Sequence, residues 1–104
     1  MTKPLALTDL QLDVLATLAG ENTRLRWHSY QTPAKAGDRG RGQILGCESK
    51  FNETCIPAYC VRSLIRRGLI APASRIERQP FRHGVTHRDY VITDVGRRSM
   101  ENAR

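Results

Sequence analysis

The sequence predicts a single α+β domain, and three features of its 104 residues lead to that prediction. Two segments repeat apolar residues at three- and four-residue steps, a pattern typical of amphipathic helices. Towards the C-terminus, two segments flank a turn that contains Pro80 and Gly84, an arrangement typical of a β-hairpin. A chain of this length can bury one modest hydrophobic core, so we expect one domain over residues 1–104.

The first helix is expected over residues 7–20. Thr8 is suited to the N-cap, and Gln11 follows at the spacing of a capping box. Gly20 is expected to end the helix as a C-terminal cap. Four apolar residues then share one broad face of the helix: Leu10, Val14, Leu15 and Leu18.

Residues 21–50 carry weaker signals. The segment 25–30 is consistent with a short strand. Thr32 to Gly42 contains Pro33 and three glycines among basic residues, so a flexible basic loop is expected there. For the segment 43–47, a return strand and a short helix are both consistent with the sequence.

A second helix is predicted within Ile56–Ile70. Pro57 suits the first turn, where its missing N–H is not needed. Gly68 is placed for a left-handed C-terminal cap and Leu69 for the accompanying apolar contact. At about 100° per residue, the core face is Cys60, Val61, Leu64 and Ile65, and the opposite face is Ala58, Tyr59, Arg62, Ser63 and Arg66.

The hairpin and a third helix complete the predicted fold. The hairpin strands are expected within Ser74–Gln79 and over Thr86–Ile92. Thr93 is suited to cap a short final helix that runs through Met100. The order is therefore helix, connector, helix, hairpin, helix.

The charge of the chain indicates an anionic partner. The formal net charge is +7, and 14 of the 17 basic residues are Arg. Arg donates bidentate hydrogen bonds and stacks on flat rings, so it suits phosphates and base edges better than Lys does. The alternative interpretation, a solvated basic surface, is weakened because the Arg residues cluster on one helical face and one hairpin.

Two segments resemble winged helix-turn-helix proteins. Residues 61–70, VRSLIRRGLI, resemble the end of a recognition helix and the start of a wing. Residues 90–98, YVITDVGRR, resemble the return wing strand and following helix of MarR-type transcription regulators. The resemblance covers roughly residues 5–100 and implies a winged helix with a three-helix core and a β-hairpin wing.

The chain also departs from that family. The usual second helix is not visible, and a Gly-rich basic loop lies where it should begin. The chain ends at Arg104 without room for the extra dimerisation helices of MarR-type regulators. The resemblance therefore implies the winged-helix fold more strongly than a dimeric, ligand-sensing repressor.

The resemblance implies a set of nucleic-acid-binding residues. A recognition helix reads base edges in the major groove, where Arg62 is the first choice for a guanine contact. Tyr59 is placed for a phosphate or a thymine methyl group, and Thr54 for a phosphate just before the helix. A basic wing enters the minor groove or follows the backbone. The full set is Thr54, Ala58, Tyr59, Arg62, Ser63, Arg66 and Arg67, with Arg75, Arg78, Arg82, His83, His87 and Arg88 from the wing and Lys35, Arg39 and Arg41 from the loop.

Two catalytic or metal-binding patterns are weak. Cys47, Cys55 and Cys60, with His83 and His87, form a possible zinc set, but seven residues separate the first two cysteines and four the next two, whereas structural zinc sites favour two to four between the first two. Asp38 with Glu48-Ser49-Lys50 resembles the Asp…Glu-x-Lys pattern of metal-dependent nucleases, but Asp38 lies in the Gly-rich segment. We therefore expect neither an enzyme nor a metal or cofactor site. Trp27 and Phe81 are expected to be packing residues.

The sequence leads us to expect a sequence-specific duplex DNA-binding transcription regulator of the cytoplasm, from a phage or other mobile element. No secretory signal is visible at the N-terminus, and no stretch approaches the ~18 apolar residues that a membrane span needs. A homodimer through the first or last helix is consistent with a two-half-site target. The alternative is a winged-helix module that engages or inhibits a partner protein or nucleoprotein complex through its basic surface.

Overall fold

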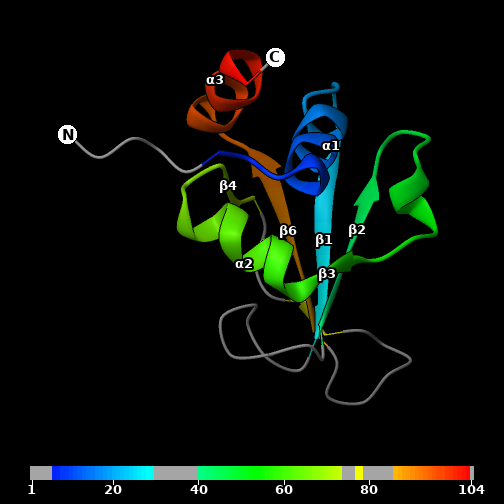
Figure 1. Ribbon diagram of the computed structural model, residues 1–104. Coiled ribbons are helices and arrows are strands. Elements are labelled where there is room, and N and C mark those ends of the chain that lie inside the picture. The colour runs from blue at the N-terminus through cyan, green and yellow to red at the C-terminus, as the bar shows by residue number, and fades with distance from the viewer. Residues whose placement is uncertain (1–5, 30–39, 74–76, 79–85, 104) are drawn as a thin grey trace.

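The protein is described by a computed structural model, which covers residues 6–29, 40–73, 77–78 and 86–103 (Figure 1). The fold is α+β, as the sequence predicted. The helices are α1 (Asp9–Leu18), α2 (Ala58–Arg66) and α3 (Asp94–Asn102), with a 3-10 turn η1 (Lys50–Asn52). The strands are β1 (Arg24–Ser29), β2 (Arg41–Leu45), β3 (Ile56–Pro57), β4 (Ile70–Pro72), β5 (Glu77–Arg78) and β6 (Thr86–Ile92).

The strands form an antiparallel sheet in the order β3-β2-β1-β6-β4, with β5 paired to β6. The strand predicted at residues 25–30 is present as β1, and β2 is its return strand. The predicted hairpin is confirmed by the pairing of β5 with β6. The basic loop predicted over 32–42 ends earlier than expected, because Arg41 and Gly42 already belong to β2; residues 30–39 lie outside the described part of the chain.

The core lies between the sheet and the helices α1 and α2, which cover one face of the sheet (Figure 1). Gly42 marks this contact, because a Cβ atom there would come within 3.2 Å of the Val61 side chain on α2. Trp27 is 2% exposed, so its predicted packing role is confirmed; Phe81 lies outside the described residues. The fully buried side chains include Val14, Leu15, Leu18, Leu25, Ile44, Ile56, Val61 and Leu64.

The ends of α1 are set by short-range hydrogen bonds. The predicted capping box is present, since Gln11 N donates to Thr8 Oγ1 and Thr8 N donates to Gln11 Oε1. The prediction that Gly20 caps the C-terminus is wrong: Ala19 is the C-cap, with a right-handed backbone. The positive φ of 59° falls instead at Asn22, and the Thr23 hydroxyl lies 2.8 Å from the Leu18 carbonyl oxygen.

The C-terminus of α2 is a Schellman motif, as the sequence predicted. Gly68 has a φ of 71°, and its N–H donates to the Ile65 carbonyl, while Leu69 N donates to the Leu64 carbonyl. Pro57 differs from the prediction, because it is the N-cap residue and the end of β3 and so precedes the first turn. The chain therefore passes directly from the sheet edge into α2.

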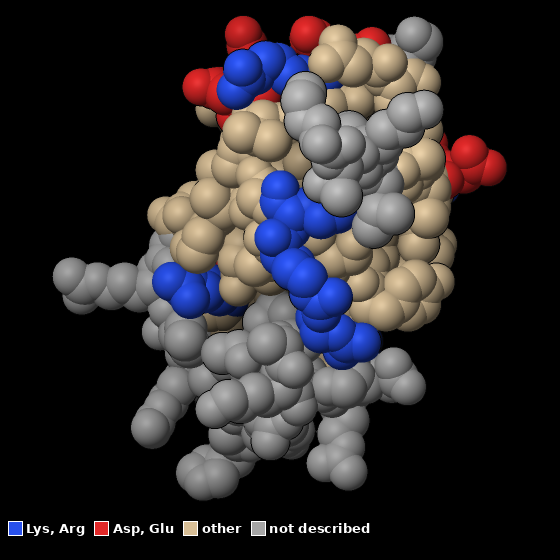
Figure 2. Space-filling model, turned by 60° about the vertical axis from the view of Figure 1, so that its left-hand side comes forward, with Lys and Arg blue, Asp and Glu red and all other residues tan. Residues whose placement is uncertain are grey.

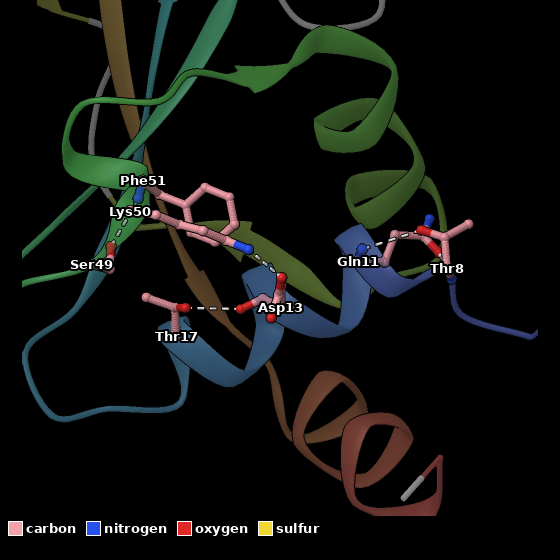
Figure 3. A network of polar contacts seen from close by, with 7 residues as sticks. All are labelled: Thr8, Gln11, Asp13, Thr17, Ser49, Lys50 and Phe51. Atoms are coloured by element: carbon pink, nitrogen blue, oxygen red, sulfur yellow. Dashed lines mark hydrogen bonds and ion pairs between the residues drawn. The ribbon is translucent and has the colours of Figure 1, made fainter.

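The segment between β2 and β3 contacts α1 through the side chains drawn in Figure 3. Lys50 in η1 donates to the Asp13 carboxylate of α1, and its ammonium lies 5.2 Å from the centre of the Phe51 ring. Phe51 is buried, and its backbone N–H donates to the Ser49 hydroxyl. These contacts hold the segment from which β3 and α2 begin.

Candidate nucleic-acid interface

The outer face of α2 carries a row of basic and aromatic side chains. Tyr59, Arg62 and Arg66 stand at positions i, i+3 and i+7 and therefore share one side of the helix. Tyr59 is 60% exposed and Arg66 is exposed, whereas Arg62 is half-buried. No acidic residue occurs in the helix sequence AYCVRSLIR. We call Tyr59, Arg62 and Arg66 the α2 stripe.

Figure 2 shows how charge is distributed around this helix. A band of basic side chains runs down the middle of the face shown, at the level of α2. Most of the acidic side chains visible in this view lie at the end of the molecule where α3 lies. The side of the molecule that carries α2 therefore presents positive charge to solvent.

Two residues predicted for the outer face of α2 lie elsewhere. Ala58 is 3% exposed and belongs to the hydrophobic core, because α2 starts at the sheet edge and its first residue packs inward. Ser63 accepts a hydrogen bond of 2.7 Å from the Gln11 amide of α1, which directs its hydroxyl towards α1. The predicted placement of both side chains on the exposed face is wrong. Arg67 is the C-cap residue of α2 and is half-buried.

Thr54 and Arg41 come together in a polar cavity of about 130 Å³. Arg41 belongs to β2, while Thr54 belongs to the exposed segment between η1 and β3. The cavity is lined by Arg41, Gln43, Asn52, Glu53, Thr54 and Cys55. Two predicted contact residues from separate segments thus share one concave site, in which Glu53 offsets part of the positive charge.

The structure describes only part of the predicted wing. Arg88 lies on β6 with its guanidinium carbon 6.0 Å from the centre of the Tyr90 ring, and burial raises the pKa of that phenol. His87 is half-buried on β6. Arg78 belongs to β5, but its side chain is not described. The predicted residues Arg75, Arg82, His83, Lys35 and Arg39 lie outside the described residues.

A second basic surface, which the sequence predictions did not identify, lies on the sheet. Leu25, Trp27 and Ser29 of β1 are buried beneath the helices, so the alternate residues of that strand point to the other face. The same alternation in β2 buries Gly42 and Ile44. The polar residues of the opposite face are Arg24, Arg26 and His28 of β1, Arg41 and Gln43 of β2, and His87 and Asp89 of β6, and we call them the polar sheet face.

The alternation of basic and apolar residues in the sequence Arg24-Leu25-Arg26-Trp27-His28 was the signal for this surface. The strand itself was expected from this segment, but its partners were not. The partner strands could not be predicted from local sequence, because the residues of β6 that pair with β1 lie about sixty positions further along the chain.

Asp89 is the carboxylate at the centre of the polar sheet face. Arg26 Nε lies 2.8 Å from Asp89 Oδ1, and Arg24 Nε lies 3.0 Å from Asp89 Oδ2. Burial alone raises the pKa of Asp89, but the hydrogen bonds and charge of Arg26, with Arg24 and His87, outweigh it and hold the pKa below its ordinary value. Asp89 is therefore a charged anchor for two arginines.

His28 and His87 are opposite residues in the β1–β6 pairing, and their ring centres are 6.2 Å apart. The pKa of His28 is lowered, mainly by burial and also by the charges of Arg41, His87 and Arg26. A hydrogen bond with Gln43 acts in the opposite direction but does not outweigh them. His28 is thus held in its neutral form near neutral pH.

Within the part of the chain that the structure describes, no three side chains of the types His, Cys, Asp or Glu gather closely enough to hold a metal ion. Cys47 is half-buried, Cys55 is exposed, and burial raises the pKa of the Cys60 thiol to about 11. Lys50 of the nuclease-like pattern is engaged with Asp13, and Asp38 lies outside the described residues. None of the described helices is both long and apolar enough to cross a lipid bilayer.

Comparison of the chain with protein-family models, with curated proteins and with solved structures gave no significant match.

Proposed function

We propose that the protein is a small nucleic-acid-binding protein that contacts duplex DNA through the α2 stripe and acts as a sequence-specific transcription regulator. The observation on which this proposal rests is the α2 stripe itself. Tyr59 and Arg66 are exposed on a helix with no acidic residue, in a chain with a net charge of +7. The proposal is one of binding and regulation, without a catalytic step.

The geometry of duplex DNA supports this use of α2. The major groove is about 12 Å wide and admits an α-helix, and Arg is the commonest side chain to read guanine there. We assign Arg62 the guanine contact, because it lies at the middle of the stripe. We assign Arg66 to a phosphate and Tyr59 to a phosphate or a thymine methyl group. Phosphate contacts fix the register of the helix, and base contacts specify the sequence.

A winged helix-turn-helix with a modified connector is the fold that we propose for this function. In its favour, α1, α2, the β5–β6 pair and α3 follow one another in the expected order. In place of the second helix, the described connector between α1 and α2 contains β1, β2, η1 and β3. The contacts of Lys50 and Phe51 hold this connector, so we propose that it supports α2 as the second helix does in the resembling family.

Additional basic residues are proposed to contact phosphates beside the groove. They are Arg67, Arg75, Arg78, Arg82, His83, Arg88, Lys35 and Arg39; Thr54 and Arg41 line the cavity that also includes Gln43 of the polar sheet face. If six to ten such contacts form, the affinity for DNA falls by about 10³–10⁵ between 50 and 200 mM salt. A protein that engages an acidic protein partner instead is expected to bind all DNA sequences weakly and equally.

Selection from a pool of random-sequence duplexes, with the bound fraction sequenced at low and at moderate salt, tests the proposal. We expect one motif to be enriched at the higher salt. The Arg62→Ala substitution should reduce the binding free energy for that motif by about 1–3 kcal/mol and relax the specificity at one base position. Arg66→Ala should weaken binding to all sequences by the same factor.

Arg98→Ala is the matched control. Arg98 lies on α3, away from the α2 stripe, so this substitution removes the same charge without changing the stripe. The proposal is wrong if no motif is enriched and the Arg62→Ala variant binds as the control does.

A further inference from the structure

The two basic surfaces of the protein lie on opposite sides of the sheet. α2 packs on the face that contains Gly42, whose backbone approaches Val61 of that helix. Arg41 and Gln43 precede and follow Gly42 in β2, so their side chains point to the other face. The sheet and α2 therefore separate the α2 stripe from the polar sheet face.

The polar sheet face is suited to a chain of phosphates. Arg24, Arg26 and His28 occupy every second position of β1, so their Cα atoms are about 6.8 Å apart. This repeat is close to the spacing of successive phosphates along one nucleic-acid strand. Arg24 keeps 42% of its side chain exposed and Arg26 keeps 27%, although both contact Asp89.

Charge complementarity points to an anion on this face. Arg24 and Arg26 of β1 contact the Asp89 carboxylate, and Arg41 of β2, opposite His28, adds a third positive charge to the same face. The cavity that contains Thr54 and Arg41 borders the same face, because Gln43 of the polar sheet face also lines it. Apart from the His28 and His87 imidazoles, no described aromatic ring belongs to this face, so stacked single-stranded bases are not favoured there.

We propose that the polar sheet face binds the phosphate backbone of a second DNA duplex, so that one protein molecule bridges two duplexes. The identity of the ligand rests on the proposed function, but the surface and its residues do not overlap the α2 stripe. Arg24 and Arg41 contact the phosphates directly, and Arg26 is held in place by Asp89. Thr54 donates to a phosphate at the rim of the cavity.

A single duplex cannot occupy both surfaces. A duplex on the α2 stripe lies on the side of α2 that faces away from the sheet. Double-stranded DNA is stiff over about 150 base pairs, so a short duplex cannot bend around the protein to the opposite face of the sheet. Two sites on opposite faces thus imply two duplexes for each protein molecule.

The experiment is a bridging assay with two short duplexes, one fixed to beads and the other fluorescent, at low salt. It compares the wild-type protein with Arg62→Gln/Arg66→Gln in the stripe and Arg24→Gln/Arg41→Gln in the polar sheet face. Arg97→Gln/Arg98→Gln on α3 is the control with an equal loss of charge. Circular dichroism verifies that each variant is folded, and titration gives the number of duplexes bound per protein.

We expect the wild type and the α3 control to bind two duplexes and to capture the fluorescent one. Each of the other variants should bind one duplex and lose at least nine-tenths of the capture. If the Arg24→Gln/Arg41→Gln variant still bridges and binds two duplexes, the second surface is refuted while the proposed function stands. If the stripe variant alone keeps full binding and bridging, the proposed role of α2 is refuted instead.

Discussion

Asp89 and Arg26 face each other across β6 and β1, and the Arg26 guanidinium donates two hydrogen bonds, of 2.8 and 3.1 Å, to the Asp89 carboxylate. Such bidentate pairs are stronger and more specific in direction than single hydrogen bonds. Arg24 Nε lies 3.0 Å from Oδ2 of the same carboxylate. The pair therefore fixes the register of the two central strands and the orientation of two arginines on the polar sheet face.

Asp89→Asn tests the structural part of this pair. Only 11% of the Asp89 side chain is exposed. The asparagine amide carries no charge, so Arg26 would lose its ion pair and keep only a weaker hydrogen-bond partner. We expect the free energy of unfolding to fall by about 1–3 kcal/mol, measured by urea denaturation at neutral pH.

Asp13→Asn is the matched control for this change. Asp13 contacts Lys50, but 54% of its side chain is exposed, so the variant should lose less than about 1 kcal/mol. An equal loss in the two variants would contradict the assigned importance of the Asp89 carboxylate.

Acid should weaken the same contact. Because the pKa of Asp89 is lower in the folded protein than its ordinary value of 3.8, the unfolded chain binds the proton more readily. The stabilisation is therefore present above that ordinary value and is lost as the pH falls through the folded pKa. In Asp89→Asn, the free energy of unfolding, measured by urea denaturation, should depend less on pH in this acid range than it does in the wild type.

His28 gives a second pH dependence at higher pH. The groups around it are Arg26 on its own strand, Arg41 and Gln43 on β2, and His87 and Asp89 on β6. The lowered pKa of His28 means that stability is present above 6.5 and is lost as the pH falls through the folded pKa. We expect His28→Gln to show a smaller loss of stability than the wild type between about pH 7.5 and about pH 5.5 in urea titrations. An unchanged pH dependence in this variant would assign the effect to another group.

The elements that the sequence predicted well are those set by neighbouring residues. The capping box of Thr8 and Gln11, the left-handed Gly68 and the N-cap Thr93 each involve residues within a few positions of one another. Propensity and hydrogen-bond chemistry at that range can be read directly from the chain.

The parts that could not be predicted depend on distant partners. Asp89 meets Arg26 across sixty-three positions, and no local pattern gives that register. The helical periodicity predicted that Ser63 lies on the exposed face of α2, but its hydroxyl accepts a hydrogen bond from the Gln11 amide of α1. The α2 stripe was identified because exposure of Tyr59 and Arg66 follows from the amphipathic pattern alone.

Thr93 is the N-cap residue of α3, and its hydroxyl group connects the first turn of α3 with the C-terminal end of α2 through two hydrogen bonds. It donates to the Gly68 carbonyl at 2.6 Å and accepts from the Gly96 N–H at 3.0 Å. Thr93→Val keeps the shape of the side chain but removes both bonds, so it should cost about 1–2 kcal/mol in thermal or urea unfolding. Thr93→Ser keeps the hydroxyl and should recover most of that stability. A valine variant as stable as the serine variant would contradict the role of the hydroxyl.

Gly96 lies in the first turn of α3, where replacement by Ala would ordinarily stabilise a helix by about 0.5–1 kcal/mol. Here the sign should be reversed. A Cβ atom on Gly96 would lie 2.2 Å from the Leu69 carbonyl oxygen and 2.9 Å from Ile92 Cγ1, and the first of these is backbone that cannot rotate away. We expect Gly96→Ala to destabilise the protein by about 1–3 kcal/mol, because α3 must move away from the end of α2.

Gly20→Ala provides the comparison for Gly96. Its nearest contact would be 3.4 Å from the Thr23 methyl group, and its φ is not among the positive ones, so the added methyl group fits. That variant should be neutral or more stable by up to about 1 kcal/mol, because Ala restricts the unfolded chain. Urea denaturation of both variants decides the matter: a Gly96→Ala protein as stable as Gly20→Ala would mean that α3 does not pack closely on Leu69.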